Sequence, residues 1–135
     1  IPQEAWVVGN MRVSHHQGKK ASIDAIAEIA KKYDVETIIT DDGIESRIAD
    51  YRGEAFKFIE KAVNTIFPEY NPVPYVMNAA TDSRYFDMVC DNCLRFVPFL
   101  IDDQQLDSIH GIDENVDIST LAPAVDFYKY VIQEA

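Results

Sequence analysis

Residues 53–67 read GEAFKFIEKAVNTIF and are followed by Pro68. Apolar residues recur in this stretch every three or four positions, which is the spacing of one face of an α-helix. That face consists of Phe56, Ile59, Ala62, Val63 and Ile66. Proline does not continue a helix, because its ring nitrogen carries no hydrogen. The sequence therefore predicts an amphipathic helix over 53–67 that buries this face.

The segments after this helix favour strands. NPVPYVMNAA at 71–80 and CLRFVPFLI at 93–101 are apolar runs bounded by turn residues, which is typical of short strands. Between them, TDSRYFDMVC at 81–90 predicts a polar turn leading into a short helix, and QLDSIHGIDENVD at 105–117 predicts a loop. Strands that alternate with helices predict an α/β layer in this part of the chain.

A closing helix is predicted from about Ser119. Its hydroxyl suits the N-cap position, and Pro123 is tolerated in a first helical turn. The apolar positions that share one side of this helix are Leu121, Val125, Tyr128 and Ile132.

The first forty residues predict strand, helix and strand. EAWVVGNMRVS at 4–14 alternates between two faces, SIDAIAEIAKKY at 22–33 has helical spacing with Ser22 as N-cap, and VETIIT at 35–40 is rich in β-branched residues. Such a unit is too small to be stable alone. The polar connection at 41–53 is the predicted domain boundary, which divides the chain into 1–40 and 41–135.

Composition limits the classes of function. The 135 residues are 47% hydrophobic and 26% charged, as in one soluble domain or two small ones. The formal net charge is -11, and residues 82–135 carry 3 basic against 11 acidic side chains, which argues against nucleic-acid binding. No stretch approaches the roughly 20 apolar residues of a membrane span. Two cysteines and the lack of a signal peptide predict a cytoplasmic protein, and the start at Ile1 suggests a piece of something longer.

Several polar residues are candidates for chemistry. His110 lies in the loop SIHGIDEN, where an imidazole could bind zinc with a nearby carboxylate holding its other nitrogen, although the loop alone favours an ordinary exposed histidine. His15 and His16 fit a solvated turn. TDSR at 81–84 suits either an anion site or a local N-cap with an Asp82–Arg84 contact. Cys90 and Cys93 have the spacing of a redox or zinc pair, but two partly buried thiols are the favoured interpretation.

The order of these pieces resembles a known family. The motifs, in chain order, are N-x-R at 10–12, DGIES at 42–46, FPE at 67–69, TDSRYF at 81–86, RF-x-P at 95–98, HG-x-DE at 110–114 and AVDFY at 124–128. This series resembles the co-catalytic zinc peptidases that include carboxypeptidase S, the aminoacylases and succinyl-diaminopimelate desuccinylase. The resemblance covers essentially the whole chain.

The resemblance implies a fold and an activity. Residues 1–40 would be the second half of an α+β lid or dimerisation domain, and 41–135 the C-terminal part of an α/β zinc-dependent catalytic domain. The whole protein would hold two zinc ions, form a homodimer through the lid, and cleave an amide next to a free carboxylate in a peptide or N-acyl amino acid. The chain by itself is expected to be inactive, because no H-x-D motif or general base is present.

The resemblance also implies roles for single residues. His110 would be a zinc ligand with Glu114 supporting it, and Arg12 would reach the substrate carboxylate. Thr81, Ser83 and Arg84 would line the substrate pocket. No catalytic residue is expected in this chain. Two other hypotheses are a non-catalytic dimerisation module and a thiol redox protein that uses Cys90 and Cys93.

Overall fold

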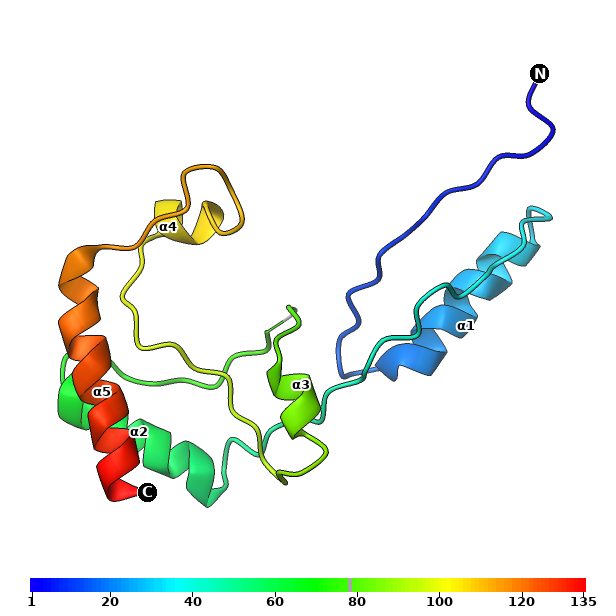
Figure 1. Ribbon diagram of the computed structural model, residues 1–135. Helices are drawn as coiled ribbons and strands as arrows, with labels where there is room; N and C mark the ends of the chain where they lie inside the picture. Colours follow the sequence, from blue (N-terminus) through cyan, green and yellow to red (C-terminus); the bar gives the residue numbers. More distant parts are fainter. Residues whose placement is uncertain (78) are drawn as a thin grey trace. The chain divides into compact units, whose positions relative to one another are not determined.

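The computed structural model describes residues 1–77 and 79–135 (Figure 1). Asn78, which falls in the predicted strand 71–80, lies outside the described residues. The elements in chain order are α1 (Gly18–Lys31), α2 (Glu54–Ile66), α3 (Ser83–Phe86), α4 (Asp103–Asp107), the 3-10 helix η1 (Ile118–Thr120) and α5 (Leu121–Glu134). In this part of the chain, none of the helices has both the length and the apolar character to cross a membrane.

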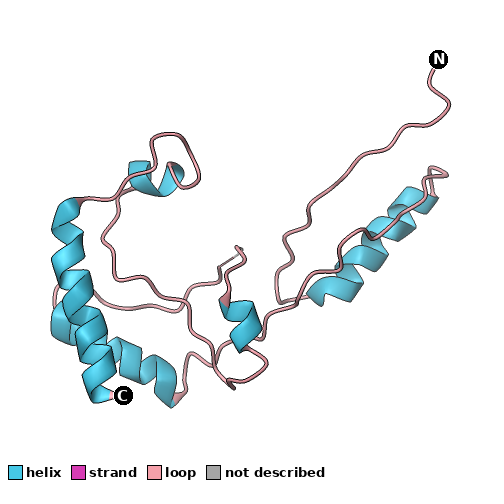
Figure 2. Ribbon diagram, viewed as in Figure 1, coloured by secondary structure: helices cyan, strands magenta, loops and turns pink. Residues whose placement is uncertain are grey.

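The predicted α/β fold is wrong for the residues that the structure describes. Figure 2 shows helices joined by loops, and no strand is present among residues 1–77 and 79–135. The predicted strands at 4–14, 35–40 and 93–101, and the described residues of the one at 71–80, are irregular backbone. Both the α+β prediction for 1–40 and the α/β prediction for 41–135 are therefore wrong for the described residues. The physical reason is that β-branched and alternating residues give a segment a tendency to form a strand but do not suffice. A strand forms only when the N–H and C=O groups of the segment pair with those of a neighbouring strand. These segments have no such neighbour in the described chain.

The chain divides into two compact units, which are described separately. Unit 1 comprises Ile1–Ile48 and Val76–Val89, and unit 2 comprises Ala49–Tyr75 and Cys90–Ala135. The predicted division at residue 40 remains a prediction.

Polar contacts organise unit 1. The ammonium group of Lys19, in the first turn of α1, donates to the backbone oxygen of Asp42 at 2.9 Å and lies 3.2 Å from its carboxylate. The returning segment therefore lies beside α1, as Figure 1 shows. The buried carboxylate of Asp87 accepts from the backbone N–H of Arg47 at 3.0 Å. These bonds join α1 to the segment that follows it, and join that segment to Asp87. Few apolar side chains of unit 1 are buried, so polar contacts carry much of its organisation.

The predicted helix at 22–33 is confirmed, but it begins earlier and without the predicted cap. Gln17 occupies the N-cap position, and α1 starts at Gly18. Ser22 lies one turn inside the helix, where its hydroxyl donates to the backbone oxygen of Gly18 at 2.8 Å. A serine hydroxyl can bond to the carbonyl four residues back, so the same residue type fits a cap or a helix interior.

The core of unit 2 lies between α2 and α5. Its buried residues are Ala62, Val63 and Phe67 from α2 and its C-cap, and Ala124 and Phe127 from α5. The ring of Phe127 lies 6.4 Å from that of Phe67 and 5.1 Å from that of Phe96, measured between centroids. The predicted helix at 53–67 and the burial of Ala62 and Val63 are thus confirmed.

The closing helix is confirmed, but the apolar side noted in the sequence is not the side that is buried. Leu121, Val125, Tyr128 and Ile132 are all exposed, and α5 turns Ala124 and Phe127 inward. The sequence of α5 is apolar on more than one side, so contacts with α2 and Phe96 decide which side is covered. The start of the helix also differs from the prediction, because α5 begins at Leu121 with Thr120 as its N-cap residue. Ser119 lies in η1 instead, where its N–H donates to the carboxylate of the N-cap residue Asp117 at 2.9 Å.

Helix α4 occupies the start of a segment predicted to be loop. Asp102 and Gln105 form a reciprocal cap, in which the Asp102 carboxylate accepts from the Gln105 N–H at 2.8 Å and the Gln105 side chain accepts from the Asp102 N–H at 3.1 Å. This Asp-x-x-Gln pattern is a capping box, which is a readable sequence signal for a helix start.

We expect Phe127→Ala to lower the free energy of unfolding by about 3 kcal/mol, because it leaves a cavity beside two aromatic rings. Phe127 is 2% exposed. The control is Ile132→Ala on the same helix, where the side chain is 78% exposed and the expected change is within about 0.5 kcal/mol. Urea denaturation measures both. Equal losses for the two variants would contradict the assignment of the buried face of α5.

Stability should also depend on pH through Asp117. Hydrogen bonds from Ser119, first of all from its backbone N–H, lower the pKa of the Asp117 carboxyl group below its ordinary value. The stabilising contribution is therefore complete above the unfolded value of about pH 4 and is lost as the pH falls through the lower pKa of the folded state.

The variant Asp117→Asn should remove that dependence, and denaturation melts between about pH 5 and pH 2 would measure it. Asp113→Asn is the control. If the wild type and Asp117→Asn lose stability in parallel below pH 4, the carboxylate does not contribute in the way described.

Candidate functional site

His110 lies in a tight turn after α4. The N–H of Gly111 donates to the backbone oxygen of Ser108 at 2.7 Å, and His110 has a φ angle of 66°. A positive φ in the third position of a four-residue turn is characteristic of type II geometry, and histidine tolerates it better than most residues. A Cβ atom on Gly111 would lie 2.9 Å from the Ser108 oxygen, so this position requires glycine. The turn leaves His110 exposed to solvent.

Glu114 closes the His110 turn through the backbone. Its carboxylate accepts from the backbone N–H of His110 at 3.1 Å. The turn is also connected to α4, since Gln105 donates to the side-chain oxygen of Asn115 at 3.3 Å and Asn115 donates to the backbone oxygen of Asp113 at 2.7 Å. The structure thus brings the predicted pair His110 and Glu114 together, and the contact that it gives Glu114 is with the backbone of His110.

The metal-ligating residues of this chain do not form a complete site. In the described ranges 1–77 and 79–135, no group of three or more His, Cys, Asp or Glu side chains is placed to hold a metal ion. A catalytic zinc ion in proteins commonly has three protein ligands. The part of the chain that the structure describes therefore offers His110 as one candidate ligand and does not fit a zinc centre by itself.

The predicted substrate-binding residues Thr81, Ser83 and Arg84 lie in one turn of unit 1. The hydroxyl groups of Thr81 and Ser83 are 2.6 Å apart, and the Ser83 N–H donates to the Thr81 hydroxyl at 3.3 Å. Arg84 donates to the Tyr85 hydroxyl at 3.0 Å and stacks on that ring, with its Cζ atom 4.9 Å from the ring centroid. Its Nε atom is buried and has no hydrogen-bond partner within the described chain. The predicted short helix here is confirmed as α3.

Arg12 also belongs to unit 1. Its Nε atom donates to the side-chain oxygen of Asn10 at 3.0 Å, so the two polar residues of N-x-R contact each other. Both side chains are exposed, as are His15 and His16 in the turn before α1. The substrate candidates are therefore in unit 1, and His110 and Glu114 are in unit 2.

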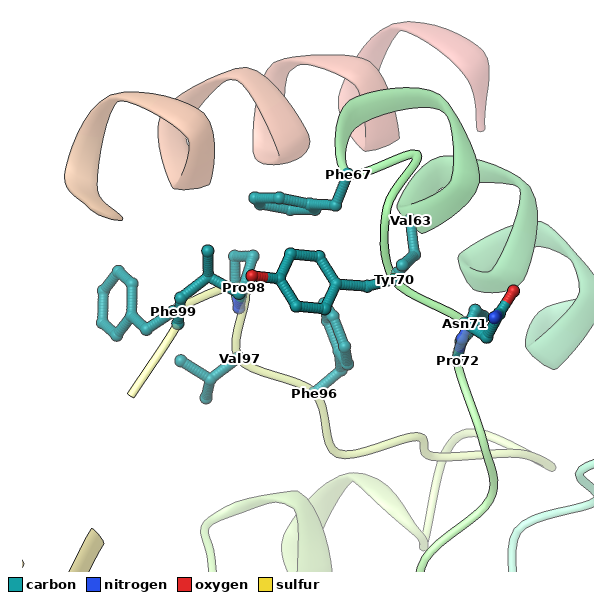
Figure 3. A pocket seen from close by; sticks show the side chains of 10 residues that line it. Val63, Phe67, Tyr70, Asn71, Pro72, Phe96, Val97, Pro98 and Phe99 are labelled. Carbon is teal, nitrogen blue, oxygen red and sulfur yellow. The ribbon is translucent and has the colours of Figure 1, made fainter. Parts of the chain in front are cut away.

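Unit 2 also contains an aromatic pocket that the sequence patterns did not reveal. Its space of about 190 Å³ lies between the end of α2 and the extended segment 96–100. Figure 3 shows the Tyr70 ring across its middle, with Phe67 on one side and Phe96 on the other. The signal was present in the aromatic residues near Pro68 and Pro98, but the strand prediction for 93–101 placed Phe96 and Phe99 in a sheet.

The two cysteines differ in exposure. Cys93 is half-buried, as expected for both, but Cys90 is exposed. Neither is in a disulfide bond.

Comparison with known proteins assigns the chain to a family. The model of peptidase family M20/M25/M40 matches residues 4–134. The chain belongs to this family. The resemblance inferred from N-x-R, TDSRYF and HG-x-DE is therefore confirmed, and all the candidate residues lie within the region that matches the M20/M25/M40 model.

Curated relatives from the same family are longer than this chain. The chain is 28% identical to probable carboxypeptidase S-like 2 of Dictyostelium discoideum over 134 residues, which are 98% of this chain and 26% of that protein. It is 26% identical to the human N-fatty-acyl-amino acid synthase/hydrolase PM20D1, covering 100% of this chain and 28% of that protein. The chain thus spans about a quarter of the length of these relatives. No solved structure matches it significantly.

We expect Glu114→Ala to loosen the His110 turn, because the variant loses a hydrogen bond to a charged acceptor. Exchange of the His110 amide hydrogen should become about tenfold faster, which NMR can measure. Asp113→Ala is the control, since the backbone oxygen of Asp113 and not its side chain receives the Asn115 bond. Similar exchange rates in Glu114→Ala and wild type would show that the carboxylate does not hold the turn.

Proposed function

We propose that this chain contributes to a zinc-dependent metallopeptidase or amidohydrolase, of the carboxypeptidase or aminoacylase type, that cleaves an amide next to a free carboxylate. The observation that carries this proposal is the match of the M20/M25/M40 peptidase family to residues 4–134. The names of the relatives, a carboxypeptidase S-like protein and an N-fatty-acyl-amino acid synthase/hydrolase, support a peptide or an N-acyl amino acid as substrate.

The substrate carboxylate is proposed to bind to residues of unit 1. Arg12 and Arg84 carry permanent positive charges, and a planar guanidinium matches a carboxylate in shape and hydrogen bonding. The buried Nε atom of Arg84 without a hydrogen-bond partner in the described chain, together with the adjacent Thr81 and Ser83 hydroxyls, supports this role. In this hypothesis Asn10 orients Arg12 through the 3.0 Å bond to its Nε atom.

His110 is proposed to be this chain's ligand for one of two zinc ions. The support is its exposure at the tip of a turn that Gly111 and Glu114 hold in a left-handed conformation. Such a turn fixes the direction in which the His110 side chain leaves the backbone, through backbone geometry rather than through burial. Because one imidazole is too few ligands for a zinc centre, we propose that the 135-residue chain alone is inactive.

Residues 1–40 are proposed to be part of a lid that forms a homodimer, and 41–135 part of the catalytic domain. Support for the dimer comes from apolar side chains near the start of the chain that are largely exposed to solvent. Trp6, Val7 and Val8 are 85%, 91% and 72% exposed. Contiguous exposed apolar surface is often covered by a partner.

The proposal is tested by His110→Ala in a whole protein of the family that includes this chain. We expect hydrolysis of an N-acyl amino acid to fall by at least about 100-fold, since even outer-shell partners of catalytic metals cost up to this much. Bound zinc, measured by atomic emission on the same preparations, should fall with it. His15→Ala is the matched control and should leave both activity and zinc content unchanged.

The carboxylate part of the proposal needs a separate substrate comparison. The methyl ester of the same N-acyl amino acid should be a much poorer substrate for the wild type, because it removes the negative charge that Arg12 and Arg84 are proposed to bind. Full activity and zinc content in His110→Ala would refute the role of His110, and equal rates for acid and ester would refute carboxylate recognition.

A further inference from the structure

Asn92 fastens the CDNC segment at residues 90–93 to the start of unit 2. Its side-chain oxygen accepts from the backbone N–H of Asp50 at 2.9 Å, and its side-chain nitrogen donates to the backbone oxygen of Asp50 at 3.2 Å. One amide group thus satisfies both backbone groups of a residue 42 positions away. We call this pair of bonds the Asn92–Asp50 clamp.

The clamp holds the turn that leads into α2. The Asp50 backbone oxygen also accepts from the Gly53 N–H at 3.2 Å, and the Asp50 carboxylate accepts from the Arg52 N–H at 2.9 Å. Gly53 is the N-cap residue of α2. Residues 50–53 are therefore ordered by bonds to Asp50, and Asn92 fixes the position of Asp50 from a distant part of the chain.

Cys90 and Cys93 flank the clamp residue on either side. The exposed Cys90 thiol is accessible to a small oxidant, and Cys93 lies three residues away in half-buried surroundings. This Cys-x-x-Cys spacing permits a disulfide between the two residues. Residues 90–93 lie in irregular backbone with a bend at residue 91 and belong to no helix.

We propose that Cys90 and Cys93 form a reversible disulfide that opens the Asn92–Asp50 clamp. A disulfide brings its two Cα atoms to within about 4.4–6.8 Å and fixes the torsion about the S–S bond. Closing such a ring across four residues rotates the backbone at Asn92. The two bonds to Asp50 require one orientation of the Asn92 amide plane, so the rotation breaks them and loosens the entry to α2.

The chemistry needs a two-electron oxidant, for which hydrogen peroxide is sufficient. The Cys90 thiolate attacks one peroxide oxygen, which breaks the O–O bond, gives a sulfenic acid and releases hydroxide that is protonated to water. The Cys93 thiolate then attacks the Cys90 sulfur, forming the S–S bond and expelling the hydroxyl group as a second water. In total, two thiols and one peroxide give one disulfide and two waters.

The test uses the 135-residue chain, labelled with nitrogen-15 and treated with stoichiometric hydrogen peroxide. Mass spectrometry should show a monomer lighter by the two thiol hydrogens, about 2 Da, with a peptide linking Cys90 to Cys93. Exchange of the Asp50 amide hydrogen should become about five- to tenfold faster, as expected for the loss of one hydrogen bond, and dithiothreitol should restore it.

Two variants separate the switch from general oxidation damage. In Cys90→Ser, peroxide should leave the Asp50 exchange rate unchanged. In Asn92→Ala, the reduced protein should already show the faster exchange, and peroxide should add little. The proposal is overturned if oxidation gives only sulfinic acid or disulfide-linked dimers, if the internal disulfide forms while Asp50 exchange stays the same, or if Asn92→Ala does not accelerate it.

Discussion

The packing of unit 2 depends on the ring of Phe127. This ring on α5 contacts Phe67 at the C-cap of α2 and Phe96 in the extended segment 93–101, so a single side chain connects three segments that are far apart in the sequence. The buried area around an aromatic side chain contributes most of the free energy available to a core with so few buried residues. Helix α4 and the His110 turn lie in the chain between Phe96 and α5, so this packing anchors the chain on both sides of them.

The segments predicted to be strands show the limit of a local pattern. Residues 4–14 alternate and residues 35–40 are β-branched, which are properties of a single segment. A sheet is a property of two segments, since each backbone N–H and C=O must find its partner on a neighbour. The structure leaves these residues without strand pairing in the described chain, and their apolar side chains are largely exposed. The helices α1, α2 and α5 were predicted for the opposite reason, because a helix satisfies its backbone internally.

As with the fold, only part of the candidate site could be predicted from the sequence. Its members could be named because N-x-R, TDSRYF and HG-x-DE are local motifs, and the family match includes all of them. Local sequence also explains the His110 turn, where a glycine follows a residue with positive φ and a carboxylate four residues on reaches the His110 amide. Three features depend on three-dimensional positions and are encoded by no motif. They are the contact of Glu114 with the backbone of His110, the stacking of Arg84 on Tyr85, and the aromatic pocket.

The sequence alone determined the family, the helical periodicity of 53–67 and the loop that contains His110, since each motif or pattern used consists of residues within a few positions of one another. The tertiary structure decided which side of α5 is buried and that Asn92 binds Asp50, as well as the unpaired state of the extended segments. The physical reason is that a burial choice or a long-range hydrogen bond depends on what lies opposite, and in α5 several apolar faces were available to the same partner. Packing against Phe67 and Phe96 selected the one that carries Ala124 and Phe127.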